Sequence, residues 1–262
     1  MADAFTPVLQ HLESACLKHG ESETTTPFVT LAYAQALDGS IAGAIGKPLR
    51  LSGSDSMLMT HRLRAWHDSI VVGVSTVVAD DPSLTVRLCS GANPLPVILD
   101  STLRTPPECK LLCEPACRRP VIATTLAGPA AAERQRLLEQ AGATILLCER
   151  EPGSHRVDLR DALERLKQTH GASRVMIEGG ASVISSLLQI DSNTLLTSGM
   201  PLVSAINVTV APTLIGGVRA VQSLLPQAAY TFPRLASPVY VRAGDDFIVH
   251  GTLCHDGPRL KL

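Results

Sequence analysis

The chain has 262 residues and a formal net charge of −1 at pH 7, with 45% hydrophobic but only 3% aromatic residues. This length suits one large globular domain or two small ones, with an aliphatic core. The balanced charge provides no overall basic field for nucleic acid or an anionic membrane surface, and no run approaches the ~18 apolar residues of a membrane span.

Residues 1–26 are predicted to form an extension before the main domain. Apolar residues recur at helical spacing between Phe5 and Leu17, which predicts a short amphipathic helix. A polar linker follows at residues 21–26. The extension lacks the long apolar stretch of a secretory signal, and the seven scattered Cys favour reduced thiols in a cytoplasmic protein.

From residue 28 onward, short apolar runs alternate with helical patterns, which predicts an α/β fold with a mixed, mostly parallel sheet flanked by helices. No linker divides the chain, so residues 27–262 are expected to form one domain. The predicted strands are 28–34, 69–74, 95–99, 121–124, 144–148, 174–177 and 206–211. The predicted helices are 54–66, 130–140, 159–170 and 181–189, and residues 239–242 and 247–253 are predicted to close the sheet as an antiparallel hairpin.

The segment Glu178-Gly179-Gly180-Ala181-Ser182 lies between a predicted strand and a predicted helix. Small residues allow backbone amides to approach a ligand, and a helix N-terminus favours an anion. A Gly-Gly pair is more often an ordinary turn, and this one is not a G-x-G-x-x-G fingerprint. The position nevertheless makes it a candidate phosphate-binding turn.

A second polar segment, residues 76–87, follows the strand at 69–74 and is expected to be a loop at the ligand edge of the sheet. It contains Thr76, Asp80 and the cationic Arg87. On the helix before that strand, His61 and Arg64 lie three residues apart and share a face. Arg64 and Arg87 are candidates to meet at one phosphate, although a solvated basic face and core or capping histidines are the simpler interpretations.

Other patterns contribute less. Asp38-Gly39 after the first strand predicts a tight turn. Cys109, Cys113 and Cys117 are evenly spaced but lack a histidine, and prolines interrupt any helix that would align them, so no metal site is expected. The sequence has no Gly-x-Ser-x-Gly elbow and no Walker A loop, and no Pro-Cys-x-x-Cys follows His11-Leu12-Glu13, so no zinc deaminase domain is predicted.

Taken together in this order, the segments resemble the riboflavin-biosynthesis reductase family, whose members are similar in fold to dihydrofolate reductase. The resemblance runs from about residue 28 to residue 217. It is carried by Tyr33-Ala34-Gln35-Ala36-Leu37-Asp38-Gly39, Met59-Thr60-His61-Arg62-Leu63-Arg64, residues 67–87, Leu99-Asp100-Ser101, Ile177-Glu178-Gly179-Gly180-Ala181 and Ala211-Pro212-Thr213-Leu214-Ile215-Gly216.

The resemblance implies an oxidoreductase, commonly a homodimer, that uses NADPH to reduce the ribosyl group of a ribosylaminopyrimidine 5′-phosphate to ribityl. The residues it implies for the cofactor site are Ala34, Thr76, Asp80, Ser101, Gly179, Gly180, Ala181, Ser182 and Val183. Those implied for the substrate site are Pro48, Arg64, Leu84, Arg87 and Glu178. Our hypothesis is that Asp80 handles a proton and that Glu178 holds the aminopyrimidine.

Leu31 occupies a position where some fused relatives carry a lysine. In this respect the chain resembles the stand-alone type of reductase, which acts on 2,5-diamino-6-ribosylamino-4(3H)-pyrimidinone 5′-phosphate. Three departures from the family pattern are Val203-Ser204-Ala205, Arg50, and an apparent insertion at 191–200. Three alternatives stay open. The first is a reductase of the same family that acts on the deaminated 5-amino-6-ribosylamino-uracil phosphate. The others are a pteridine or dihydrofolate reductase, which would not need Arg64 and Arg87 to bind a phosphate, and an inactive NADP(H)-binding homologue.

Overall fold

The computed structural model describes residues 3–22, 24–43, 49–196, 201–221 and 234–254. The chain forms two units, each treated separately below. The first unit comprises Met1–Thr24, Phe28–Thr60 and Gly179–Leu262, and the second comprises Thr25–Pro27 and His61–Glu178. None of the helices within the described ranges is both long and apolar enough to cross a membrane.

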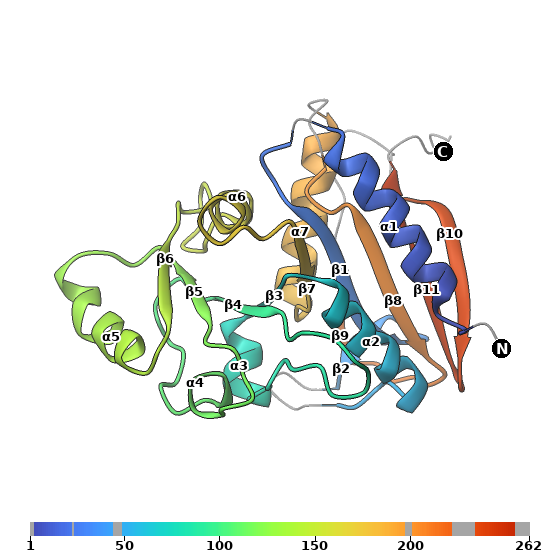
Figure 1. Cartoon of the computed structure of the whole chain (residues 1–262), viewed down its shortest axis with the longest axis horizontal. Helices are drawn as coiled ribbons and strands as arrows, with labels where there is room; N and C mark the ends of the chain where they lie inside the picture. Colours follow the sequence, from blue (N-terminus) through green and yellow to red (C-terminus); the bar gives the residue numbers. More distant parts are fainter. Residues whose placement is uncertain (1–2, 23, 44–48, 197–200, 222–233, 255–262) are drawn as a thin grey trace. The chain divides into compact units, whose positions relative to one another are not determined.

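The sheet of the first unit has the strand order β10-β11-β8-β1 (Figure 1). These strands are β1 (Phe28–Ala36), β8 (Ala205–Ala211), β10 (Arg234–Ala243) and β11 (Asp246–Cys254). β1 and β8 are parallel, whereas β11 is antiparallel to both of its neighbours. Gly244, with φ of +63°, opens the two-residue turn between β10 and β11. The predicted closing hairpin is therefore confirmed, and its strands are longer than predicted.

The described part of the first unit contains two complete helices, α1 and α7. In α1 (Thr6–Gly20), Val8 and Leu12 are fully buried, and the helix lies against β1 and β11 (Figure 1). The predicted amphipathic helix thus packs on the sheet. α7 (Ala181–Leu196) runs well past its predicted end and includes most of the apparent insertion, while residues 197–200 lie outside the described residues.

Two polar side chains, Asp191 and Ser204, make hydrogen bonds near the start of β8. The buried carboxylate of Asp191 accepts hydrogen bonds from the amides of Leu202 and Val203, at 2.5 and 3.0 Å. Ser204, one of the departures from the family pattern, accepts the Val29 amide through its hydroxyl at 3.2 Å. The departure therefore contributes a side-chain hydrogen bond to the start of β1.

The second unit contains an all-parallel sheet in the order β7-β3-β4-β5-β6. Its strands are β3 (Ser69–Gly73), β4 (Leu95–Leu99), β5 (Val121–Thr124), β6 (Thr144–Leu147) and β7 (Arg174–Ile177). Its complete helices are α3 (Val74–Asp80), α4 (Lys110–Cys113), α5 (Pro129–Gln140) and α6 (Leu159–His170). Gly171, with φ of +65°, ends α6 as predicted. The parallel strands and the helical crossovers confirm the predicted fold class.

The segment expected as a loop from residue 76 begins instead as a helix, α3. Val74 and Val77 are buried on one side of it, in a core cluster that also contains Leu84 and Leu103. A seven-residue helix has little stability of its own, so tertiary packing of these valines determines its formation. The helix α4 and the short ladder of β2 (Ser40–Ala42) with β9 (Val218–Arg219) were likewise not predicted, because each is too short for a periodic pattern.

The boundary between the units falls within α2 (Ser54–Trp66), which has its predicted bounds. Within the part of the chain that the structure describes, the Ser54 hydroxyl bonds the Asp55 side chain, at 3.4 Å, and no backbone amide of this helix. Asp246, from the β10–β11 hairpin, instead accepts the Gly53 amide at 2.8 Å and the Ser56 hydroxyl. A carboxylate distant in the sequence therefore accepts the hydrogen bonds of donor groups at the start of α2.

Candidate active site

Three adjacent parallel strands of the second unit, β7, β3 and β4, end at one edge of the sheet. Glu178 directly follows β7, Thr76 and Asp80 lie on α3 directly after β3, and Ser101 follows β4. The Glu178 amide continues the ladder by donating to the Val71 carbonyl at 2.9 Å. Ligands of parallel α/β sheets bind at this edge.

Arg64 and Glu178 form a two-pronged ion pair in the second unit. The Arg64 Nε and Nη2 atoms each donate to a separate Glu178 carboxylate oxygen at 2.8 Å. The side chains are only 11% and 22% exposed, so the pair is partly shielded from water. Burial disfavours the charged guanidinium, but the Glu178 charge and hydrogen bonds outweigh it and raise the pKa of Arg64.

Thr85 connects the two arginines that were expected to meet. Its carbonyl accepts from Arg64 Nη1 at 3.3 Å, and its hydroxyl accepts from Arg87 Nη1 at 3.1 Å. Arg87 is otherwise exposed, whereas Thr85 is buried. Sequence reasoning did not single out Thr85. The only indication of Thr85 in the sequence is its place between Leu84 and Arg87, two residues implied for the substrate site.

Leu84 is buried in the hydrophobic core beside α3, with only 4% of it exposed. Its φ of +51° is in the left-handed region, which is unusual for a residue other than glycine. The side chain therefore faces the protein interior, and any contact of Leu84 with a ligand would involve its backbone.

His61 of α2 and His67, which directly follows this helix, are both buried, in line with the core role favoured from their spacing. His61 Nδ1 accepts the Arg87 amide at 2.9 Å, and His67 Nδ1 lies 2.6 Å from the Leu63 carbonyl. Desolvation is the main cause that lowers the pKa of each to about 4, and nearby arginines lower it further. Both imidazoles are therefore neutral near pH 7.

These buried histidines predict a stability loss in mild acid. Below about pH 6.5 the unfolded chain binds protons at both positions, whereas the native protein does not until about pH 4. The free energy of unfolding should therefore fall between pH 7 and pH 5, by about 2 kcal/mol for each histidine. Urea unfolding at the two pH values measures the loss, and His61→Asn should remove about half of it. An unchanged urea midpoint would contradict the prediction.

The remaining candidates of the second unit differ in environment. Asp80 is exposed at the end of α3, yet partial desolvation of its carboxyl raises its pKa above the ordinary value. Thr76, one turn earlier, is half-buried. The Ser101 hydroxyl oxygen accepts the Val157 amide at 3.0 Å, which leaves its own proton free to be donated.

In the first unit, the glycine-rich turn leads into α7. A Cβ added to Gly179 would lie 2.7 Å from the Val183 Cβ, so the turn has no room for a side chain there. Residues 179–181 are half-buried, and the first turn of α7 contains no acidic residue. Close backbone approach and the positive helix end make this turn suited to an anion such as a phosphate.

Ala34 is half-buried on β1, two residues from the strand end. Beyond that end, the predicted Asp38-Gly39 turn is present, with φ of +80° at Gly39. The Asp38 carboxylate accepts the Gly216 amide at 2.5 Å and the Ser40 hydroxyl at 2.9 Å. The hydrogen bond from Gly216 is the main cause that lowers the pKa of Asp38. The turn thus joins two segments that the family resemblance quoted separately.

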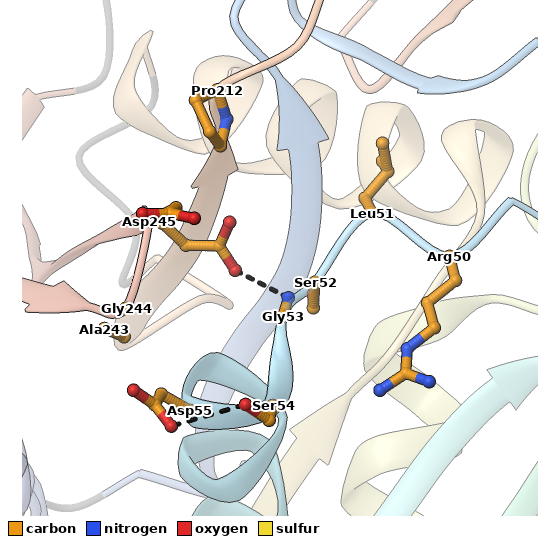
Figure 2. Close-up of a pocket in the computed structure, with 11 residues that line it drawn as sticks. Arg50, Leu51, Ser52, Gly53, Ser54, Asp55, Pro212, Ala243, Gly244 and Asp245 are labelled. Carbon is orange, nitrogen blue, oxygen red and sulfur yellow. Dashed lines mark hydrogen bonds between the residues drawn. The ribbon is translucent and has the colours of Figure 1, made fainter.

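A pocket of ≈ 400 Å³ lies in the first unit between the start of α2 and the β10–β11 turn (Figure 2). Arg50, the departure from the family pattern, lines it together with Ser52 and Asp245. Pro48, a candidate for the substrate site, falls outside the described residues. Within the described ranges, no three potential metal ligands come together, including the three evenly spaced cysteines.

Comparison with known proteins gives a match to the RibD C-terminal domain over residues 27–237. The chain belongs to the RibD C-terminal domain family. This confirms the resemblance inferred from the sequence, and the matched residues of the family domain include parts of both units.

Several members of the RibD C-terminal domain family are similar along most of this chain. The 2,5-diamino-6-ribosylamino-4(3H)-pyrimidinone 5′-phosphate reductase of Methanothermobacter thermautotrophicus is 38% identical over 73% of this chain and 80% of its own. The riboflavin biosynthesis protein RibD of Actinobacillus pleuropneumoniae is 32% identical over 83% of this chain and 51% of its own. The solved riboflavin biosynthesis reductase Rib7 of Saccharomyces cerevisiae is 26% identical, with a TM-score of 0.67 and coverage of 94% and 98%.

Proposed function

We propose that this chain is an NADPH-dependent reductase that converts the ribosyl side chain of 2,5-diamino-6-ribosylamino-4(3H)-pyrimidinone 5′-phosphate to ribityl in riboflavin biosynthesis. The observation that supports it best is the Arg64–Glu178 pair, joined through Thr85 to Arg87, at the ligand edge of a parallel sheet. The archaeal relative at 38% identity carries the name of this activity. Dihydrofolate contains no phosphate group, so the exposed Arg87 is better explained by a phosphorylated substrate.

For the substrate, we propose that Arg87 binds the 5′-phosphate, because its guanidinium is exposed and donates only to Thr85 among the described residues. Glu178 would accept hydrogen bonds from the amino groups of the pyrimidine, while Arg64 holds its carboxylate in place. Leu84 would contribute backbone contacts, and Pro48 stays a prediction. Binding of the phosphate orients the ribose for reduction.

The cofactor proposed is NADPH, which when bound supplies the hydride for carbon 1 of the opened ribose. The crowding of Gly179 against Val183 fits a group that needs close backbone approach, such as a dinucleotide phosphate. The residues that we assign to it are Ala34, Thr76, Asp80, Ser101, Gly179, Gly180, Ala181, Ser182 and Val183.

Asp80 is proposed to handle the proton that accompanies reduction. Its raised pKa keeps more of the carboxyl protonated near neutral pH than an ordinary aspartate would. Asp80→Asn should lower kcat by about 10²-fold, within the usual range for a general acid or base. Steady-state kinetics with NADPH absorbance measures this effect. Near-normal turnover of the variant would remove Asp80 from the mechanism.

The proposed function is tested by following NADPH oxidation with the diamino compound and, in parallel, with the deaminated 5-amino-6-ribosylamino-uracil phosphate. Oxidation with the diamino compound alone supports the proposal. Oxidation with only the deaminated compound keeps the reductase and changes its substrate. NADPH binding without oxidation of either would favour an inactive NADP(H)-binding homologue.

We further propose a homodimer in the cytoplasm. Tyr240 on β10 and Phe247 on β11 are 68% and 55% exposed. Tyr240 pairs with Val249, two residues from Phe247, so both aromatic rings lie on one sheet face. Such exposed aromatic groups are typical of protein interfaces. Light scattering should give twice the chain mass of 27.8 kDa, and a monomer would contradict the assignment.

A further inference from the structure

The segment that carries Arg87 is held by side chains rather than by a helix or strand. Residues 82–94 contain neither, and Asp81 and Leu84 have left-handed φ values of +41° and +51°. The Val86 amide donates to Asn93 Oδ1 at 2.7 Å, and the Arg87 amide donates to His61 Nδ1 at 2.9 Å. The position of the Arg87 backbone therefore depends directly on an imidazole of α2.

The imidazole of His61 is suited to accept this hydrogen bond. It is completely buried, and Arg64 and Arg87 lie close enough for their charges to oppose its protonation. A neutral imidazole that accepts at Nδ1 carries its proton on Nε2. The buried Nε2 atom has no hydrogen-bond partner among the described residues.

That second nitrogen argues against a purely stabilising role for His61. A buried N–H group without a partner costs free energy, which an apolar side chain of similar size at this position would avoid. The histidine contributes one bond that an apolar residue cannot make, the bond to the Arg87 amide. The guanidinium of the same Arg87 is held at Thr85 Oγ1, so its backbone and its side chain each have one fixed contact.

We propose that His61 is a positioning residue for substrate binding: its neutral Nδ1 fixes the Arg87 amide, and with Thr85 it holds the Arg87 guanidinium ready for a phosphate monoester. This inference rests on the proposed function for the identity of the ligand. The hydrogen bond itself is independent of that function and is testable without substrate.

The test compares three variants with the wild-type protein. His61→Leu removes the acceptor, and His61→Asn keeps one, because the asparagine Oδ1 lies where Nδ1 does. His67→Leu is the matched control: it removes a second buried histidine, directly after α2, whose Nδ1 contacts the Leu63 carbonyl of that helix. For each protein we would measure KM for the pyrimidinone phosphate, KM for NADPH, and hydrogen exchange of the Arg87 amide in arginine-labelled protein.

His61→Leu should raise KM for the phosphorylated substrate about tenfold, as expected for one lost hydrogen bond, and speed Arg87 amide exchange by a similar factor. KM for NADPH should stay within about twofold. His61→Asn should return the substrate KM and the Arg87 exchange rate most of the way to their wild-type values. His67→Leu should change neither quantity. An unchanged substrate KM with unchanged Arg87 exchange in His61→Leu would overturn the proposal.

A measurement on the wild-type protein covers the case in which the leucine variant does not fold. Nitrogen-15 correlation spectra at pH 7 should give His61 as the neutral tautomer with its proton on Nε2. A proton on Nδ1 would overturn the inference. If wild-type protein oxidises no NADPH with either substrate, the proposed function fails, while the tautomer and the Arg87 exchange rate still decide the role of His61.

Discussion

Replacing Glu178 with glutamine is expected to lower kcat/KM for the pyrimidinone phosphate by about 10²–10³-fold, with NADPH affinity changed only a few-fold. The substitution keeps the size of the side chain but removes its charge. Arg64 would keep at most one good acceptor from position 178, and its guanidinium would remain 11% exposed without a counter-charge. In the proposed complex, the pyrimidine amino groups would also face an amide in place of a carboxylate.

The size of this effect follows from the environment of the pair. Removing one partner of a fully buried ion pair costs about 3–5 kcal/mol, and exposed pairs are worth about 0–1 kcal/mol. The Arg64–Glu178 pair is close to the buried limit but still reaches water, so about 1–3 kcal/mol of folding stability should also be lost. Urea unfolding and steady-state kinetics on the same preparation separate the two losses.

The chain offers a matched control on α5. Arg136 and Glu133 form the same two-pronged arrangement, at 2.8 and 3.2 Å, but their side chains are 54% and 69% exposed. Glu133→Gln should leave kcat/KM unchanged. If Glu178→Gln were as active as Glu133→Gln, the partly buried pair would have no role in substrate binding.

Substituting alanine for Gly179 is expected to weaken NADPH binding at least tenfold and to cost about 1–3 kcal/mol of stability, the usual cost of overpacking. The added methyl carbon would lie 2.7 Å from the Val183 Cβ and 2.9 Å from its Cγ1. Such short separations force the start of α7 to shift. The shift would move the backbone amides proposed to bind the cofactor phosphates.

Gly20→Ala is the control for this second prediction. It makes the same chemical change in the same unit, at the end of α1, where an added Cβ meets no atom within 4 Å. Its NADPH dissociation constant should equal that of the wild type in fluorescence titration. Tight NADPH binding by Gly179→Ala, with a normal urea midpoint, would exclude the turn before α7 as a phosphate site.

Local sequence patterns were sufficient for most of the longer helices and strands of both units. The alternation of apolar runs and helical periods predicted the parallel strands, and Gly171 predicted the end of α6. The order of the short motifs along the chain was also enough to indicate the family. These features are predictable because each depends on residues close to one another in the sequence, within one turn, one strand or one short motif.

The tertiary structure alone revealed which side chains meet. Arg64 binds Glu178 across 114 positions of sequence, His61 binds the amide of Arg87, and Asp246 binds the start of α2 from the far end of the chain. The sequence likewise could not predict that α3 is helical, since its valines favour a strand until the core packs them. Partners distant in sequence leave no periodic pattern. Their pairing is decided by the folded backbone and by the free energy of leaving a buried polar group unsatisfied.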